Sequence, residues 1–197
     1  MTEVITNTRR NFLGKMTAVT LSATALALLD GNEALAAGMA KKKGHGNAAG
    51  DVAILNVALG LEHEAINAYT LGAQSGLLAK PVLDLAVLFQ SHHKSHRDAL
   101  ASTIGTLGGK PVKEKTLAEY ATALNAGSIK SANDILELAR RLELGAINAY
   151  LGVIPSLGDK ELGKVAARIA ADETMHWTIL NSAMGGSPNA SALGFGA

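Results

Sequence analysis

Six ionisable side chains interrupt helical stripes that are otherwise apolar. Glu62 and Glu143 each lie within a stripe of residues spaced three or four apart, where a helical bundle would normally carry Leu. The other four form two pairs with a spacing of three residues, which places both members on one helix face: His93 with His96, and Glu173 with His176. The pattern predicts that carboxylates and imidazoles converge near the middle of their helices.

Buried carboxylates of this kind require a partner, because an unpaired one is costly and normally changes its protonation state. Three carboxylates and three imidazoles at one depth would satisfy one another best around a shared cation. The chain has no Cys, so thiolate sites are excluded and a metal ion would have to be held by His, Asp and Glu. The alternative is an ordinary ion pair between a buried Glu and Arg97, Arg140 or Arg141.

Three neighbouring side chains are candidates for a supporting role. His92 is one step from its stripe, and we predict a further ligand, a partner of a ligand, or a surface residue. Tyr69 and Tyr150 lie two turns beyond Glu62 and Glu143 on the same stripes, where they could hydrogen-bond the carboxylates or pack in the core.

Two other residues next to the candidate ligands are predicted to point elsewhere. Glu64 is turned about 200° from Glu62 by the helix and is expected to face solvent. Trp177 is about 100° from the face of His176 and is expected to pack between helices.

The elements that must position these residues are helices. Aromatic residues make up 4% of the chain and only 4 of 197 residues are Pro, which favours an all-α protein over a sandwich or barrel. The pattern starts at Asp51, an N-cap type of residue, and Thr116 is expected to cap a short helix. Periodicity and stop signals together predict five helices, at 51–72, 81–108, 117–124, 131–153 and 160–185.

An internal repeat relates the two halves of the chain. The segment from Glu62 to Tyr69 returns 81 residues later as Glu143 to Tyr150, with Ala-Ile-Asn-Ala-Tyr identical in both. The His93 pair corresponds to the Glu173 pair at an offset of 80 residues. Two helix-turn-helix units joined by a longer crossover predict an antiparallel four-helix bundle with pseudo-twofold symmetry.

This set of residues resembles the motif of the ferritin-like carboxylate-bridged dimetal proteins. The chain carries one Glu on the first and third long helices, Glu-x-x-His on the fourth, and a variant of Glu-x-x-His on the second. The resemblance covers about residues 51–184 and relates the chain to rubrerythrins and ferritins. It implies a ferritin-like antiparallel four-helix bundle with a long crossover between two helix pairs. It also implies one or two transition-metal ions, iron first and Mn, Zn or Cu as alternatives, held by Glu62, His93, His96, Glu143, Glu173 and His176.

His93 departs from the family pattern, because a Glu that bridges two metals is expected at that position. A neutral imidazole offers one lone pair and cannot bridge as a carboxylate does. The ligand set then carries a charge of −3 rather than −4, and a single ion or two unequal sites become alternatives to a dimetal centre. The additional imidazole also shifts the metal preference towards Zn, Cu or Fe(II).

The resemblance implies a metal-binding oxidoreductase that reacts with oxygen or peroxide, such as a ferroxidase or peroxidase, in the setting of a stress response. Two other classes stay open: a non-catalytic metal-binding protein, and a structural bundle that has lost its metal. Whether the protein is an enzyme is therefore left undecided by the sequence. With 18 basic and 17 acidic residues, the net charge of +1 gives no electrostatic reason to expect a nucleic-acid partner.

The first 36 residues are predicted to be a targeting segment. Arg9 and Arg10 stand in a stretch that resembles the twin-arginine (Tat) export signal, and an apolar run of about 14 residues follows. That run is shorter than the roughly 20 residues of a membrane span, and residues 34–36 (Ala-Leu-Ala) offer a cleavage site. We expect a periplasmic or secreted protein with no stable membrane span after cleavage; an uncleaved N-terminal anchor is the alternative.

These observations divide the chain into four parts: a signal peptide at 1–36, a flexible linker at 37–50, the bundle at 51–185 and a flexible tail at 186–197. The expected partners are metal ions, oxygen or peroxide, and the twin-arginine export machinery. A homo-oligomer is compatible with the sequence, which does not define its size.

Overall fold

A computed structural model describes residues 48–188 and 192–196, so the predicted signal peptide lies outside the described residues. The described part contains five α-helices and no strand, which confirms the all-α prediction. The helices are α4 (Ala48–Gln74), α5 (Lys80–Thr106), α6 (Leu117–Ala123), α7 (Ala132–Val153) and α8 (Lys160–Ala183). Within these residues no helix has both the length and the hydropathy that crossing a membrane requires.

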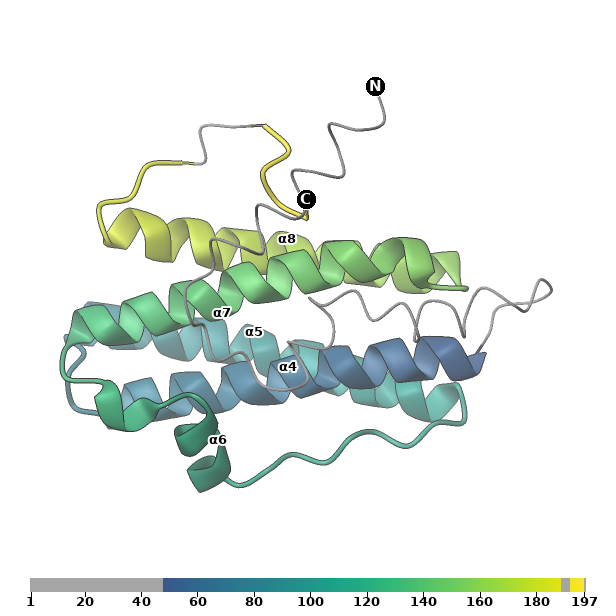
Figure 1. The fold of residues 1–197 in the computed structure, drawn as a ribbon, viewed down its shortest axis with the longest axis horizontal. Coiled ribbons are helices and arrows are strands. Elements are labelled where there is room, and N and C mark those ends of the chain that lie inside the picture. Colours follow the sequence, from purple (N-terminus) through teal and green to yellow (C-terminus); the bar gives the residue numbers. More distant parts are fainter. Residues whose placement is uncertain (1–47, 189–191, 197) are drawn as a thin grey trace.

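The four long helices lie side by side as a helical bundle (Figure 1). α4 packs against α5, and α7 packs against α8, each pair being joined by a short link. Contacts between α4 and α7 and between α5 and α8 bring the two pairs together. Between α5 and α7 the chain makes a long connection along the bundle, and α6 lies within it (Figure 1).

Local signals account for most helix boundaries. Thr116 and Ser131 each form a capping box, accepting a hydrogen bond from the backbone of Glu119 and Asp134 respectively. Asp159 caps α8. These N-caps satisfy backbone N–H groups that a helix start leaves without partners.

The start of α4 differs from the prediction. The helix begins at Ala48, three residues before Asp51. Asp51 is therefore not an N-cap: it is 3% exposed and its Oδ1 accepts a hydrogen bond from the backbone N–H of Gly158 at 2.8 Å. The residue joins α4 to the link between α7 and α8, a contact 107 residues away in the chain that no local pattern could have indicated.

Glu64 also differs from the prediction, since it is 4% exposed rather than facing solvent. The connection before α6 runs along α4 and is held to it by side chains of that helix. Asn56 bonds the backbone of Lys110 and Val112, and Asn67 donates to a carboxylate oxygen of Glu114 at 2.6 Å. This connection, α6 and α7 together cover the flank of α4 that an isolated helix would expose.

Two groups of buried apolar side chains flank the middle of the bundle. The larger group draws on α4, α5, α7 and α8 and includes Leu59, Ile104 and Ile169. The second, around Phe89 and Leu180, also draws on all four long helices. The space between the two groups is occupied by polar side chains.

Trp177 packs against the C-terminal segment. Its ring lies edge-to-face with Phe195 at a centroid distance of 5.2 Å, and both line a cavity of about 590 Å³ between α8 and that segment. Its aromatic partner is therefore in the C-terminal segment rather than in a neighbouring helix.

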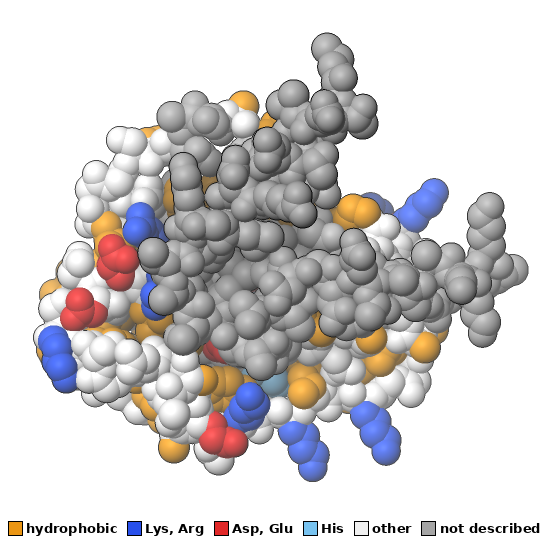
Figure 2. Space-filling model, viewed as in Figure 1, with side chains coloured by type: hydrophobic (Ala, Val, Ile, Leu, Met, Phe, Trp, Pro, Cys, Tyr) orange, Lys and Arg blue, Asp and Glu red, His pale blue; other side chains and the backbone are white. Residues whose placement is uncertain are grey.

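On the face drawn in Figure 2, charged side chains of both signs are scattered around the edge of the described surface.

Candidate metal centre

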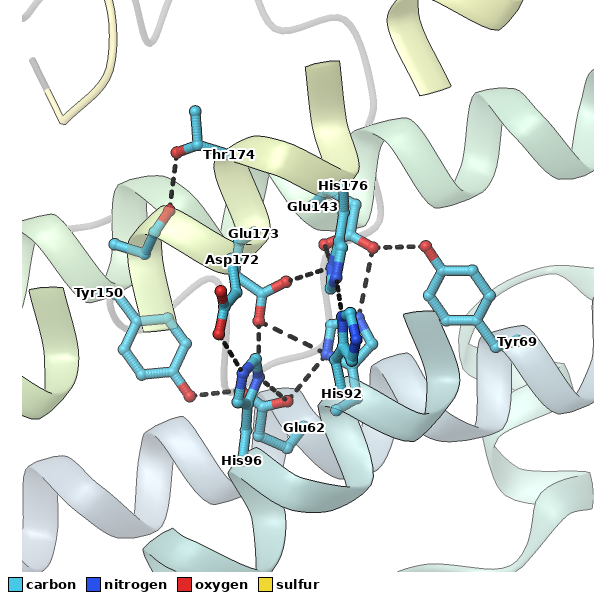
Figure 3. Close-up of polar contacts among 12 residues, drawn as sticks. Glu62, Tyr69, His92, His96, Glu143, Tyr150, Asp172, Glu173, Thr174 and His176 are labelled. Atoms are coloured by element: carbon cyan, nitrogen blue, oxygen red, sulfur yellow. Dashed lines mark hydrogen bonds and ion pairs between the residues drawn. The ribbon is translucent and has the colours of Figure 1, made fainter. Parts of the chain in front are cut away.

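The six residues singled out by the sequence meet in the interior of the bundle. They come from all four long helices (Figure 3), and none exposes more than 8% of its surface. Their ligand atoms form two groups, each of four residues whose donor atoms all lie within 4.8 Å of one another. The groups are Glu62, His93, His96 and Glu173, and His93, Glu143, Glu173 and His176.

The first group is centred on one oxygen of Glu62. Its Oε2 lies 2.9 Å from Nδ1 of His93 and 3.6 Å from Nδ1 of His96. Nδ1 of His96 is also 3.1 Å from Oε1 of Glu173. Two carboxylates and two imidazoles thus face one another from α4, α5 and α8.

The second group repeats this arrangement on the other side. His176 Nδ1 lies 3.0 Å from Oε2 of Glu173 and 3.4 Å from Oε2 of Glu143. The remaining oxygen of Glu143, Oε1, is 3.3 Å from Nε2 of His93. The two groups therefore share Glu173 and His93, each of which presents a different atom to each group.

Both tyrosines hydrogen-bond a carboxylate of the site. Tyr69 on α4 donates to Glu143 on α7 at 2.5 Å, and Tyr150 on α7 donates to Glu62 on α4 (Figure 3). Each tyrosine therefore serves the Glu of the other sequence repeat, which requires α4 and α7 to run in opposite directions. Of the two roles predicted for Tyr69 and Tyr150, hydrogen bonding to a carboxylate occurs, and both rings also pack in the apolar groups.

The histidines of α5 and α8 are held from outside by two further residues. His96 Nε2 lies 3.1 Å from Asp172, which leaves its Nδ1 directed into the site. His176 Nε2 lies 2.9 Å from Nδ1 of His92, while its ring stacks on Phe89 at 4.2 Å between centroids. Such outer partners fix the orientation and tautomer of a metal-binding imidazole.

Asp172 was not found from the sequence. Its side chain is 51% exposed, and its spacing does not distinguish it from other acidic residues on α8. His92, predicted to be a further ligand, a partner of a ligand or a surface residue, lies next to the candidate ligand His176.

The carboxylates differ in pKa because their neighbours differ. Burial raises the pKa of Glu62, but the hydrogen bond with His93 and the positive charge of His93 and His96 outweigh it and hold that pKa at about 2. Burial acts against ionisation of Glu143 as well, yet the charge on His93 lowers its pKa. For Glu173, burial dominates and raises the pKa above its ordinary value.

The imidazoles are held in the protonated form when no metal competes. Burial lowers the pKa of His96, but the close contacts of its ring with Glu173 and Glu62 and the negative charge of these carboxylates raise it to about 10. The pKa of His93 is raised well above its ordinary value, since the charges of Glu173 and Glu143 outweigh burial. Protons on these rings supply the positive charge that the surrounding carboxylates require, and a metal cation would replace them.

The hydrogen bonding of the site is incomplete, which is the observation that tests whether these residues suit a metal. Oε2 of Glu143, Oε1 of Glu173 and Nδ1 of His96 are buried and make ionic contacts, but have no partner of acceptable hydrogen-bond geometry. Buried polar atoms are rarely left in this state. Carboxylate and imidazole donors pointing to common points fit a transition-metal ion.

Of the arginines considered as alternative partners, Arg97 and Arg140 are engaged elsewhere and Arg141 is exposed. Arg97 pairs with Asp98 at 2.8 Å. Arg140 contacts Glu137 and donates to Asn181 at 2.9 Å. Among the described contacts, Glu62, Glu143 and Glu173 have histidines and tyrosines as their partners.

Comparison with known proteins agrees with this geometry. A family model described as a ferritin-like domain matches residues 50–186, which include all six convergent residues. No curated protein and no solved structure matches the chain significantly. The match covers well over half of the 197 residues, and the chain belongs to the ferritin-like domain family.

Proposed function

We propose that the protein binds transition-metal ions, iron in the first place, between the four long helices and that the bound metal reacts with oxygen or peroxide. The observation that carries this proposal is the set of three glutamates and three histidines, buried and facing one another, with three donor atoms left without a hydrogen bond. A redox-active metal bound there would supply electrons for reduction of the oxidant.

The chain itself contributes position, charge and the exclusion of water. Tyr150 and Tyr69 each engage one oxygen of their carboxylate, which leaves the other oxygen directed into the site. Asp172 and His92 direct Nδ1 of His96 and His176 inward. The apolar groups on either side keep bulk water out, so charge interactions in the site are strong.

Room for a small reactant lies between α4 and α7. A cavity of about 30 Å³ is lined by Glu62, His93 and Glu143, with small residues such as Gly145 and Ala149 on its α7 side. That volume accommodates a molecule about the size of water. A diatomic oxidant or peroxide could reach the carboxylates there, whereas a large organic substrate could not.

The finer features of the family resemblance belong to the same proposal. We infer an antiparallel four-helix bundle with a long crossover, supported by the opposed directions of α4 and α7 and by the connection through α6. Export through the twin-arginine pathway to the periplasm or beyond rests on Arg9, Arg10 and the apolar run. The relationship to rubrerythrins rests on the ligand motif alone.

The second candidate is a non-catalytic metal-binding protein, favoured by His93, which stands where the resemblance leads us to expect a bridging Glu. Peroxide consumption distinguishes the two. Iron-loaded wild-type protein, given an excess of a chemical reductant such as ascorbate to return the oxidised iron to Fe(II), should consume hydrogen peroxide over many turnovers. Glu173→Gln should lose that activity because it removes a charge shared by both groups. An iron-loaded wild-type protein that retains its metal but leaves peroxide unchanged would favour the non-catalytic role.

A further inference from the structure

His93 lies between the two groups of ligand atoms with both ring nitrogens engaged. Nδ1 is 2.9 Å from Glu62 and 3.5 Å from Glu173, on the side of His96. Nε2 is 3.3 Å from Glu143, on the side of His176. The ring is 1% exposed, so neither nitrogen is available to solvent.

The internal repeat gives His93 a counterpart with the same placement. Glu173 is the equivalent residue of the second half and presents Oε1 to His96 and Oε2 to His176. The two residues are thus the members common to both groups, and each offers one donor atom per group. A residue shared in this way is in the position of a bridge.

We infer that His93 bridges two metal ions, binding one through Nδ1 and the other through Nε2. This inference rests on the proposed metal-binding function. A neutral imidazole has a lone pair on one nitrogen only, so binding of the second ion displaces the remaining ring proton to solvent and leaves an imidazolate. No electron transfer is involved, and the bridging ring carries one negative charge, as a carboxylate bridge would.

Each ion then has four donors from the chain. One is bound by Glu62 and His96 and the other by Glu143 and His176, with His93 and Glu173 contributing one atom to each. Four donors of mixed imidazole and carboxylate type match the tetrahedral preference of zinc, which has no redox chemistry of its own. Zinc is therefore the appropriate probe of the geometry.

The bridge predicts a long separation between the ions. The two nitrogens of the ring are about 2.2 Å apart and their lone pairs diverge, so with metal–nitrogen bonds of about 2.0–2.1 Å the ions lie about 6 Å apart. Dimetal sites of the usual type are about 3.5–4 Å apart. The difference is large enough for anomalous diffraction to resolve.

The experiment is to load the protein with Zn²⁺, count the bound ions by native mass spectrometry and locate them by anomalous diffraction. We expect two ions about 6 Å apart, each bonded to one nitrogen of His93. In H93E, a carboxylate replaces the ring and the separation should fall to about 3.5–4 Å. In H93Q, the side chain is an amide without the two ring nitrogens, and the affinity for the second ion should fall at least about tenfold.

The matched control is H63Q, which changes a buried histidine of α4 that belongs to neither group and should leave two ions at the wild-type distance. Thermal unfolding of each variant verifies that it is folded. Two ions about 3.5–4 Å apart in the wild type, or one ion only, would overturn the bridge while leaving the metal-binding proposal intact. Wild-type protein that binds no zinc and no iron would overturn both.

Discussion

Tyr69 and Tyr150 show how single residues orient the carboxylates of the site. Each is buried, and each donates a hydrogen bond to a carboxylate on the opposite helix. Burial, together with the negative charge of that carboxylate, raises the pKa of both hydroxyls above its ordinary value, so both keep their proton. A neutral donor of this kind fixes one carboxylate oxygen and leaves the other directed towards the histidines of the site.

Removing one of these hydroxyls should weaken metal binding without unfolding the protein. We expect Tyr150→Phe to lower the affinity for Zn²⁺ by about 10–100-fold, the usual effect of losing a partner of a metal ligand. Competition with a chelator of known affinity measures the change. Tyr120→Phe is the matched control, because Tyr120 is buried near α4 but contacts the backbone of Lys115 instead of the site; equal losses in both variants would contradict this role.

The pKa values of the site also predict how the metal-free protein responds to pH. The pKa of His96 is about 10 in the folded protein against an ordinary 6.5, so its stabilising contribution is complete below pH 6.5 and is lost as pH rises through about 10. The pKa of Glu62 is about 2 against 4.5, so its contribution is present above pH 4.5 and is lost as pH falls through about 2. The free energy of unfolding should therefore be greatest between about pH 4.5 and 6.5.

Urea unfolding at a series of pH values measures this profile. Binding of Zn²⁺ should reduce the decrease in the free energy of unfolding at alkaline pH, because an imidazole that binds the metal has already lost its proton. In the metal-free protein, His96→Gln should make the free energy of unfolding depend less on pH in the alkaline range. A metal-free protein whose stability rises between pH 7 and 10 would contradict the charge assignment.

At the scale of elements, local sequence signals defined most of the helices that carry the site. The N-cap at Thr116 occurs as predicted, Asp159 caps α8 at the expected start of that helix, and the link residues end the helices near their expected positions. The stripe pattern also indicated which faces of the long helices point inward. These features depend on neighbours within a few residues, so one sequence contains the information.

Features that depend on distant segments could not be predicted in the same way. Glu64 is 4% exposed on a helix that packs against α6 and α7, and Asp51 is buried where the α7–α8 link returns to it. The crossing of Tyr69 and Tyr150 to opposite repeats also follows from how α4 and α7 pack. Helical periodicity specifies a direction from the helix axis and does not specify what lies there.

The capping box of α7 gives a prediction at this scale. Ser131 accepts a hydrogen bond from Asp134, and Asp134 accepts from the backbone of Ser131 in return. Ser131→Ala should lower the free energy of unfolding by about 1 kcal/mol and leave the number of bound ions unchanged, since Glu143 is three turns away. Ser95→Ala, on the exposed face of α5, should change stability by less than about 0.5 kcal/mol; urea unfolding compares them.

For the whole molecule, the notable feature is a block of charged residues between two apolar groups. Buried ionic clusters often cost stability relative to apolar residues of similar size. A structural bundle without metal would therefore gain stability from Glu62→Leu, and the melting temperature would rise. If the cluster exists to hold metal, the same change should abolish metal retention and make the protein less stable than metal-loaded wild type.

Calorimetry with and without Zn²⁺ separates these outcomes. Glu62→Gln is the matched control, because it keeps the shape of the side chain and an acceptor for Tyr150 while removing the charge. We expect Glu62→Gln to lose the zinc-dependent rise in melting temperature as Glu62→Leu does. A full zinc-dependent rise in either variant would exclude Glu62 from the ligand set.

The most direct test is the metal content of the protein purified from the organism that produces it, determined by elemental analysis. The account predicts one or two equivalents of a transition metal, iron first, in the wild type and close to none after Glu62→Leu or Glu143→Leu. Wild-type protein that is folded but contains no more transition metal than those variants would contradict it.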